Sequence, residues 1–202
     1  MARTYRIADM NQTYPLMRGA APLLTALASA ALLKEPLSPP AWLGVAVICA
    51  GVIGMAAGRR SGQGRGVALA LVNAVVIAGY TLVDGAGVRR SGAPAAYTLW
   101  IFLLTGAPFA GWLLAFRASA FRRYVARTWR LGLAGGFGTT ASYGLALWAM
   151  TVAPIAVVAA LRESAILFAT AISVFVLKET VSPARLAGAG VIALGAVILR
   201  LA

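Results

Sequence analysis

The chain has 202 residues, of which 61% are hydrophobic and 11% charged, and its formal net charge is +13. This composition, with a mean hydropathy of +0.85, excludes an ordinary soluble globular protein. There is no histidine, and the single cysteine, Cys49, lies inside an apolar run, which excludes Ser-His-Asp and Cys-His catalysis, a disulfide framework and the usual zinc spacings. We therefore expect no enzyme activity, no cofactor and no metal.

Seven apolar runs approach the roughly 20 residues that a helix needs to span a bilayer. In chain order they cover Tyr14–Leu33, Ala41–Ala57, Gly66–Val88, Ala95–Phe116, Leu131–Met150, Pro154–Leu177 and Ala184–Leu201. The second run is near the lower limit for a span. The runs predict an all-α, polytopic integral membrane protein with about seven transmembrane helices. No Gly-Lys-Ser/Thr triplet is present, so a nucleotide-driven pump is excluded.

The first two runs recur near the end of the chain. Arg18–Gly51 aligns without a gap on Arg162–Gly195, a constant offset of 144, with 13 of 34 positions identical. Rare charges stay in register across the copies, which indicates duplication rather than chance. Each copy predicts an apolar helix with an arginine, a Lys-Glu and Ser-Pro turn, and a second apolar helix. Corresponding points lie five spans apart, and this odd number predicts inverted copies, as in many transporters.

Two adjacent charges, Arg162 and Glu163, fall inside the sixth run. A charge near the bilayer centre costs about 2.5–3.5 kcal/mol, so each side chain is expected to face a watery cavity or a partner helix. Neighbouring residues on a helix point roughly 100° apart, so the two do not pair neatly with each other. The alternative to a cavity role is a structural ion pair that locks two helices. Arg18 has the matching position in the first copy, with Gly19 beside it, and either lines the cavity or snorkels to the interface.

Asn73, Tyr80 and Asp84 recur in the third run at intervals of seven and four, which places them on one helical face. They are candidate cavity residues. Asp84 has an alternative interpretation as an interfacial carboxylate paired with Arg89 or Arg90.

The fifth run is rich in small residues. The spacing of Gly132 and Gly136 favours close helix packing, with a flexible hinge as the alternative. Tyr143 and Trp148 follow on the same helix as candidate cavity residues, although Trp148 also suits an interface anchor.

Positive residues outside the runs fall into two sets, because successive connections between spans lie on opposite sides of the membrane. The larger set is Arg3, Arg6, Arg59, Arg60, Arg65, Arg117, Arg122, Arg123, Arg127, Arg130, Lys178 and Arg185, and the opposite set is Lys34, Arg89, Arg90 and Arg200. The positive-inside rule then predicts a cytoplasmic N-terminus, a cytoplasmic Arg117–Arg130 loop and an external C-terminus. Because these residues lie in short loops between apolar runs, they indicate topology and not a nucleic-acid partner.

Several segments together resemble the EamA-type family of the drug/metabolite transporter superfamily. They are Tyr14–Leu24, Leu33–Pro39 and Gly44–Val52, and in the second copy Ala153–Glu163, Leu177–Glu179 and Ser182–Pro183. The resemblance implies ten helices, as two inverted repeats of five around a central cavity, that move small metabolites without ATP. It also implies a cytoplasmic C-terminus, opposite to the charge count. The cavity lining would come from the helices that carry Arg18, Asn73, Tyr80, Asp84, Tyr143, Trp148, Arg162 and Glu163.

On this basis residues 1–57 are expected to be the last two helices of the first repeat, 58–65 an Arg/Gly-rich linker, and 66–202 a second repeat of five helices. The 144-residue offset then predicts that about three helices of the first repeat are absent. The function expected is secondary transport of a small metabolite or drug-like compound, by a permease or exporter in a bacterial cytoplasmic (inner) membrane. Arg162 would hold an anionic group while Glu163 or Asp84 takes a proton. The alternative is a truncated, non-transporting membrane fragment, or a partner subunit that assembles as a homo-oligomer or with the absent half.

Overall fold

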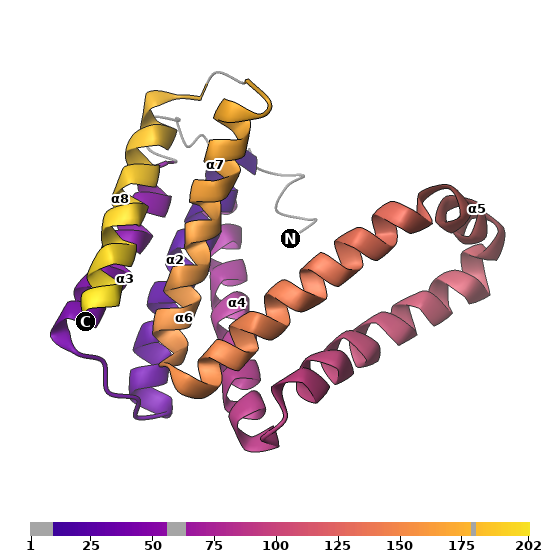
Figure 1. The fold of residues 1–202 in the computed structure, drawn as a ribbon, viewed down its shortest axis with the longest axis horizontal. Coiled ribbons are helices and arrows are strands. Elements are labelled where there is room, and N and C mark those ends of the chain that lie inside the picture. Colours follow the sequence, from indigo (N-terminus) through magenta and orange to yellow (C-terminus); the bar gives the residue numbers. More distant parts are fainter. Residues whose placement is uncertain (1–9, 56–63, 179–180) are drawn as a thin grey trace. The chain divides into compact units, whose positions relative to one another are not determined.

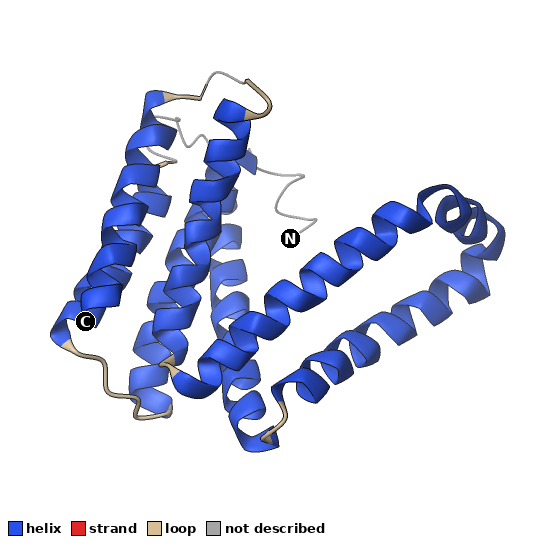
Figure 2. Cartoon of the chain, in the orientation of Figure 1, coloured by secondary structure: helices blue, strands red, loops and turns tan. Residues whose placement is uncertain are grey.

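The described residues of the chain form helices and the turns between them. The computed structural model describes residues 10–55, 64–178 and 181–202, and in these ranges there are helices and turns but no strands (Figure 2). The all-α prediction is confirmed. Arg3, Arg6, Arg59, Arg60 and Glu179, and positions 58–63 of the expected linker, lie outside the described residues. The other two linker positions, Gly64 and Arg65, already belong to a helix.

The chain divides into two compact units, Met1–Val83 with Ala153–Ala202, and Asp84–Val152. The first unit is a helical bundle (Figure 1). Its described elements are α2 (Met10–Leu32), α3 (Pro39–Gly54), the first part of α4 (Gly64–Ser91), α6 (Ile155–Leu161), a 3-10 turn (Arg162–Ser164), α7 (Ala165–Phe175) and α8 (Pro183–Leu201). The second unit holds the end of α4 and the whole of α5 (Pro94–Val152).

The described part of each of the seven predicted runs is mainly helical. Five helical segments are long and apolar enough to cross a membrane, namely Tyr14–Leu32, Gly66–Ser91, Pro94–Val152, Ile155–Phe175 and Pro183–Leu201. The number differs from seven for two reasons: α3 has only 16 residues, and α5 contains two of the predicted runs.

The prediction of a loop at Arg117–Arg130 is wrong, because this segment lies within helix α5. Arg117 alone has non-helical angles (φ −140°, ψ 31°), and the residues after it continue as helix to Val152. Positions 118–130 contain neither proline nor glycine and include three alanines and four arginines, all compatible with a helix. Charge density marked this segment as a loop, but its backbone propensity is helical.

The sixth run is not one uniform helix. α6 starts after Pro154, the backbone tightens into a 3-10 turn at Arg162–Ser164, and α7 continues to Phe175. The charged pair of this run therefore sits at a break in regular α-helix. Such mid-helix 3-10 turns often mark hinges or functional positions.

The two copies of the Lys-Glu and Ser-Pro turn have matching geometry. Lys34 and Lys178 both adopt φ 53°, the left-handed conformation that ends a helix. Ser38 and Ser182 then cap α3 and α8, with side-chain oxygens that accept hydrogen bonds from the backbone N–H of residues three positions later. The next residue in each copy is a proline at the first helical position. The repeated sequence thus produces the same local structure twice.

α3 and α8 cross in an antiparallel sense through paired glycines. A Cβ built on Gly195 would lie 3.0 Å from the Gly44 carbonyl oxygen, and one on Gly51 would lie 3.0 Å from the Gly188 carbonyl oxygen. The 144-residue offset of the duplication relates Gly44 to Gly188 and Gly51 to Gly195, so it exchanges these two glycine pairs. Small residues at these positions let the two backbones approach closely, and the buried Val45, Ile48, Val52 and Ile192 fill the space beside them.

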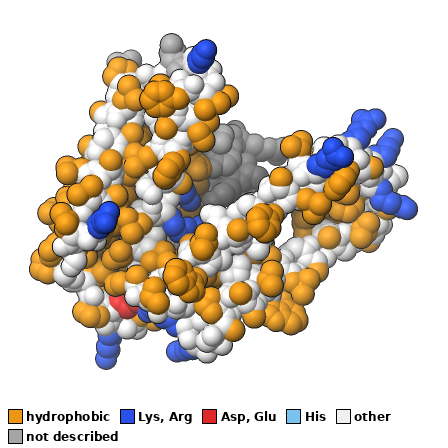
Figure 3. Space-filling model, viewed as in Figure 1, with side chains coloured by type: hydrophobic (Ala, Val, Ile, Leu, Met, Phe, Trp, Pro, Cys, Tyr) orange, Lys and Arg blue, Asp and Glu red, His pale blue; other side chains and the backbone are white. Residues whose placement is uncertain are grey.

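Much of the remaining apolar surface is exposed. On α5, Leu103, Phe109 and Phe137 are all more than half exposed, and hydrophobic side chains cover much of the visible face (Figure 3). A surface of this composition suits hydrocarbon and not water.

Candidate functional site

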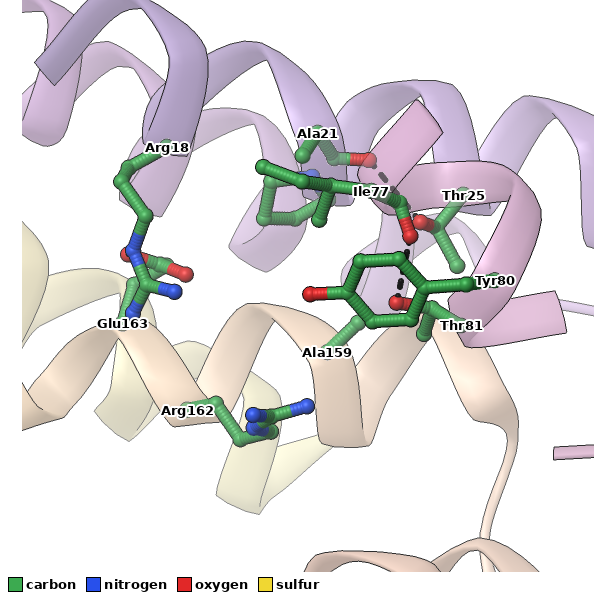
Figure 4. A pocket seen from close by; sticks show the side chains of 10 residues that line it. Arg18, Ala21, Thr25, Ile77, Tyr80, Thr81, Ala159, Arg162 and Glu163 are labelled. Atoms are coloured by element: carbon green, nitrogen blue, oxygen red, sulfur yellow. Dashed lines mark hydrogen bonds and ion pairs between the residues drawn. The ribbon is translucent and has the colours of Figure 1, made fainter. Parts of the chain in front are cut away.

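A pocket in the first unit lies between three helical segments (Figure 4). Its empty space is about 330 Å³, including the open mouth. The lining comprises Arg18, Ala21, Pro22 and Thr25 from α2; Ile77, Tyr80 and Thr81 from α4; and Ala159, Arg162 and Glu163 from α6 and the 3-10 turn. Four of the eight candidate residues, Arg18, Tyr80, Arg162 and Glu163, therefore share one pocket.

Glu163 and Arg18 form an ion pair across this pocket. Arg18 Nε lies 3.2 Å from Glu163 Oε2, and the side chains are 26% and 5% exposed respectively. Neither atom makes a hydrogen bond of good geometry with a described group, so the contact is mainly electrostatic. Glu163 thus forms this ion pair with a residue of α2 and not with its sequence neighbour Arg162.

The 3-10 turn separates the directions of its two charges. Glu163 lies against Arg18, whereas the half-buried Arg162 extends from the other side of the same turn (Figure 4) and lines the pocket together with Tyr80. Broken helices in transporters present charged groups and backbone dipoles to a substrate in this way.

Two buried threonines that were not among the sequence candidates complete the wall. Thr25 Oγ1 donates to Ala21 O at 2.9 Å, and Thr81 Oγ1 donates to Ile77 O at 2.7 Å. Each hydroxyl satisfies its proton within its own helix and keeps its oxygen as an acceptor. The spacing of seven between Arg18 and Thr25, two helical turns, is the sequence signal that places them on one face.

A second polar cluster lies within the other unit. The Tyr143 hydroxyl donates a short hydrogen bond to Asp84 Oδ2, and its ring meets Phe102 edge to face at 6.0 Å. The Tyr97 hydroxyl lies against Gly87, where any Cβ would collide with it. Asp84 thus accepts a hydrogen bond from the hydroxyl of Tyr143. Arg89, an alternative partner for Asp84 in the sequence analysis, donates a hydrogen bond of 2.6 Å from Nε to the carbonyl oxygen of Met150.

The remaining candidates do not line the pocket of Figure 4. Asn73 donates from Nδ2 to Leu69 O, one turn back on α4, at 2.8 Å. Trp148 is 57% exposed on α5.

Glu35 makes a contact between the two copies that the search for charges inside the runs did not include. Its Oε2 accepts a hydrogen bond of 3.2 Å from the backbone N–H of Ile155, the first residue of α6. A carboxylate there complements the positive end of the helix dipole. The repetition of this glutamate in both copies was the available signal. The turn of the first copy therefore anchors the start of the helix that leads to Arg162 and Glu163.

The described residues contain no group of three or more His, Cys, Asp or Glu side chains that could hold a metal ion. The chemistry that the pocket offers is ionic and hydrogen-bonding.

The long apolar helices, with a pocket of paired charges between three of the segments, define a polytopic membrane protein. The chain belongs to the EamA-like transporter family, whose sequence profile matches residues 64–201, about two thirds of the chain. Searches of curated proteins and of solved structures each returned no match. The match runs from α4 to α8 and includes the second copy of the duplicated segment, so the resemblance to this family is confirmed there.

Proposed function

We propose that the chain is a secondary transporter that binds a small organic anion in the pocket between α2, α4 and the 3-10 turn. The observation that carries this proposal is the charge of the pocket. Among the described residues that line it, two carry a guanidinium group, Arg18 and Arg162, and one carries a carboxylate, Glu163, so these side chains sum to a formal charge of +1. That charge complements a monoanionic metabolite or drug-like compound.

The cost of charge inside a membrane supports a binding role. Arginine in a spanning segment is expensive unless it meets a counter-charge or water. Glu163 offsets Arg18 directly. Arg162 also lines the pocket, where a carboxylate or phosphate of the substrate would form a bidentate, charge-assisted contact with its guanidinium.

The rest of the lining suits a small compound with an apolar portion. Ile77, Ala159 and the ring of Tyr80 provide apolar contacts beside the charges.

Glu163 is the proposed coupling group. Arg18 on α2 pairs with it, Tyr80 on α4 and its neighbour Arg162 line the same pocket, and Cys49 on α3 is near enough to interact with it electrostatically. A proton on Glu163 would break its ion pair with Arg18 and make the formal charge of the pocket more positive, which favours binding of the substrate anion. Asp84, with its tyrosine hydrogen bond, is the second candidate for a proton.

The repeated segment supplies the moving parts in this proposal. We infer that residues 1–57 and 66–202 belong to two inverted repeats, because the 144 offset exchanges the glycine pairs of α3 and α8. Repeats related in this way can rock against each other around a central site. The proposed location is a bacterial cytoplasmic membrane; the apolar helices support a membrane that proteins cross as helices.

Reconstitution in vesicles tests the function. The purified chain is assayed with a panel of labelled small carboxylates, phosphate esters and cationic compounds, with and without a pH gradient. Anion uptake that falls in Arg162→Ala and loses its response to the gradient in Glu163→Gln is expected. Arg185→Ala, which removes one guanidinium outside the pocket, is the matched control. Unchanged transport in both pocket variants would remove this mechanism. Anion binding without uptake would instead favour the alternative of a partner subunit or a homo-oligomer.

A further inference from the structure

The turn of α5 carries the densest charge in the second unit. Five arginines, Arg117, Arg122, Arg123, Arg127 and Arg130, fall within 14 residues, and no acidic residue occurs between Asp84 and Glu163. All five are exposed. Figure 1 shows α5 turning here, with a short coiled segment between its two long arms, and Figure 3 shows Lys and Arg side chains gathered at this end of α5. The counter-charge for this cluster must therefore come from outside the segment.

Helical geometry sorts this segment into two faces. At about 100° per residue, Arg123, Arg127 and Arg130 share one face, and Arg122 lies at its edge. The opposite face holds Phe121, Tyr124, Val125 and Thr128. A loop has no such faces, so the amphipathic character follows from the helix that the structure shows.

Aromatic residues accompany the arginines. The guanidinium carbon of Arg130 lies 5.4 Å from the centroid of the Trp129 ring, a cation–π arrangement. Tyr124 is 68% exposed and Trp129 51% exposed. Exposed tryptophan and tyrosine beside arginine are typical of the headgroup level of a bilayer.

The length of the preceding arm places the segment at that level. Positions 94–116 form 23 helical residues before the non-helical Arg117, which corresponds to about 34 Å at 1.5 Å per residue. A hydrocarbon core is about 30 Å thick. The charges therefore emerge where the hydrocarbon meets the headgroups.

We propose that residues 117–130 form a docking surface for anionic phospholipids. The phosphate diesters of the headgroups bind Arg122, Arg123, Arg127 and Arg130, and the face with Phe121 and Tyr124 enters the acyl-chain boundary. A nucleic acid or an acidic protein domain would satisfy the charges but would leave the apolar face in water. A lipid surface satisfies both faces at once.

The test compares lipid classes on the full chain in detergent. The purified, delipidated protein is titrated with phosphatidylglycerol or with phosphatidylcholine, and bound lipid is counted by native mass spectrometry. A preference for phosphatidylglycerol that falls at least about tenfold is expected in the variant with Arg122, Arg123, Arg127 and Arg130 all replaced by Gln.

Two further variants make the result specific. A control with Lys34, Arg90, Arg185 and Arg200 replaced by Gln has the same net charge and is expected to keep the preference. A variant with lysine at the four α5 positions keeps the charge, reports on folding, and is expected to bind phosphatidylglycerol. The proposal is overturned if the quadruple Gln variant keeps its lipid preference or if the control loses as much. Binding of a short RNA duplex without any preference among lipids would also overturn it.

Discussion

Arg18 Nε, on α2, lies 3.2 Å from Oε2 of Glu163, in the turn between α6 and α7. In the alignment of the copies Arg18 corresponds to Arg162, and Glu163 corresponds to Gly19. A Cβ on Gly19 would approach Ile53 Cγ1 to 2.7 Å, so the first copy has no room for the carboxylate. The two copies thus contribute unequally to this ion pair: the arginine comes from the first copy and the carboxylate from the second.

Glu163→Gln is expected to lower the free energy of unfolding by about 1–3 kcal/mol, because a largely buried guanidinium loses its counter-charge. Thermal unfolding in detergent measures the change. Arg18→Gln in the same background should restore part of the loss. Strictly additive effects of the two changes would show that the ion pair contributes nothing.

Anion affinity should rise as pH falls through the range where Glu163 takes up a proton. Its carboxylate opposes the guanidinium groups of Arg18 and Arg162, so protonation changes the formal charge of the pocket from +1 to +2. Glu163→Gln should bind the anion tightly at every pH. Titration calorimetry at several pH values, with the transported anion as ligand, checks both statements. A variant that keeps the wild-type pH profile would assign the titrating group elsewhere, with Asp84→Asn as the next variant to measure.

Gly195→Ala is expected to destabilise the α3–α8 contact by about 1–3 kcal/mol, because the new methyl group meets Ile48 N at 2.9 Å and Gly44 O at 3.0 Å. Gly190→Ala on the same helix is the matched control, because a Cβ there has nothing within 4 Å. It should be neutral or slightly stabilising. Unfolding of both variants in mixed detergent micelles gives the comparison, and equal losses would argue against close glycine packing.

Lys34→Gly should stabilise the chain by about 0.5–1 kcal/mol, since glycine adopts the positive φ of this position without strain. Lys34→Ala removes the same charge but keeps a Cβ, and it should give no such gain. The same pair of changes at Lys178 should behave alike. Thermal unfolding curves for the four variants decide the matter, and a similar shift for Gly and Ala would indicate a charge effect.

The sequence was sufficient to predict the class, the helical runs and the paired turns, because apolar length and the Ser-Pro caps are local signals. It also marked Arg18, Tyr80, Arg162 and Glu163, since polar residues in apolar runs are costly and rare. Two features of the fold could not be predicted from the sequence. The run Pro154–Leu177 has no internal glycine or proline to announce the 3-10 turn, and the segment after Arg117 is helical despite its charge.

The spacing of seven residues puts Thr25 on the same helical face as Arg18, but the sequence does not show that Thr25 and Thr81 share one pocket wall. Thr25 and Thr81 look like ordinary threonines that bond back to their own helices. Only the packing of α2 against α4 brings them to one wall with the charges. The hydrogen-bond partner of Asp84 could not be predicted from the sequence either, because Tyr143 is far from it along the chain.

The shortness of α3 has a consequence for the lipid around it. Its 16 residues extend about 24 Å, less than a hydrocarbon core of about 30 Å. Leu43 and Ile53, exposed near its two ends, mark the limits of a shallow apolar flank. Hydrophobic mismatch of this size is relieved when the bilayer thins locally or the helix ends draw water inward. We therefore expect the bilayer to be locally thinner beside α3, which shortens the distance between the two aqueous sides.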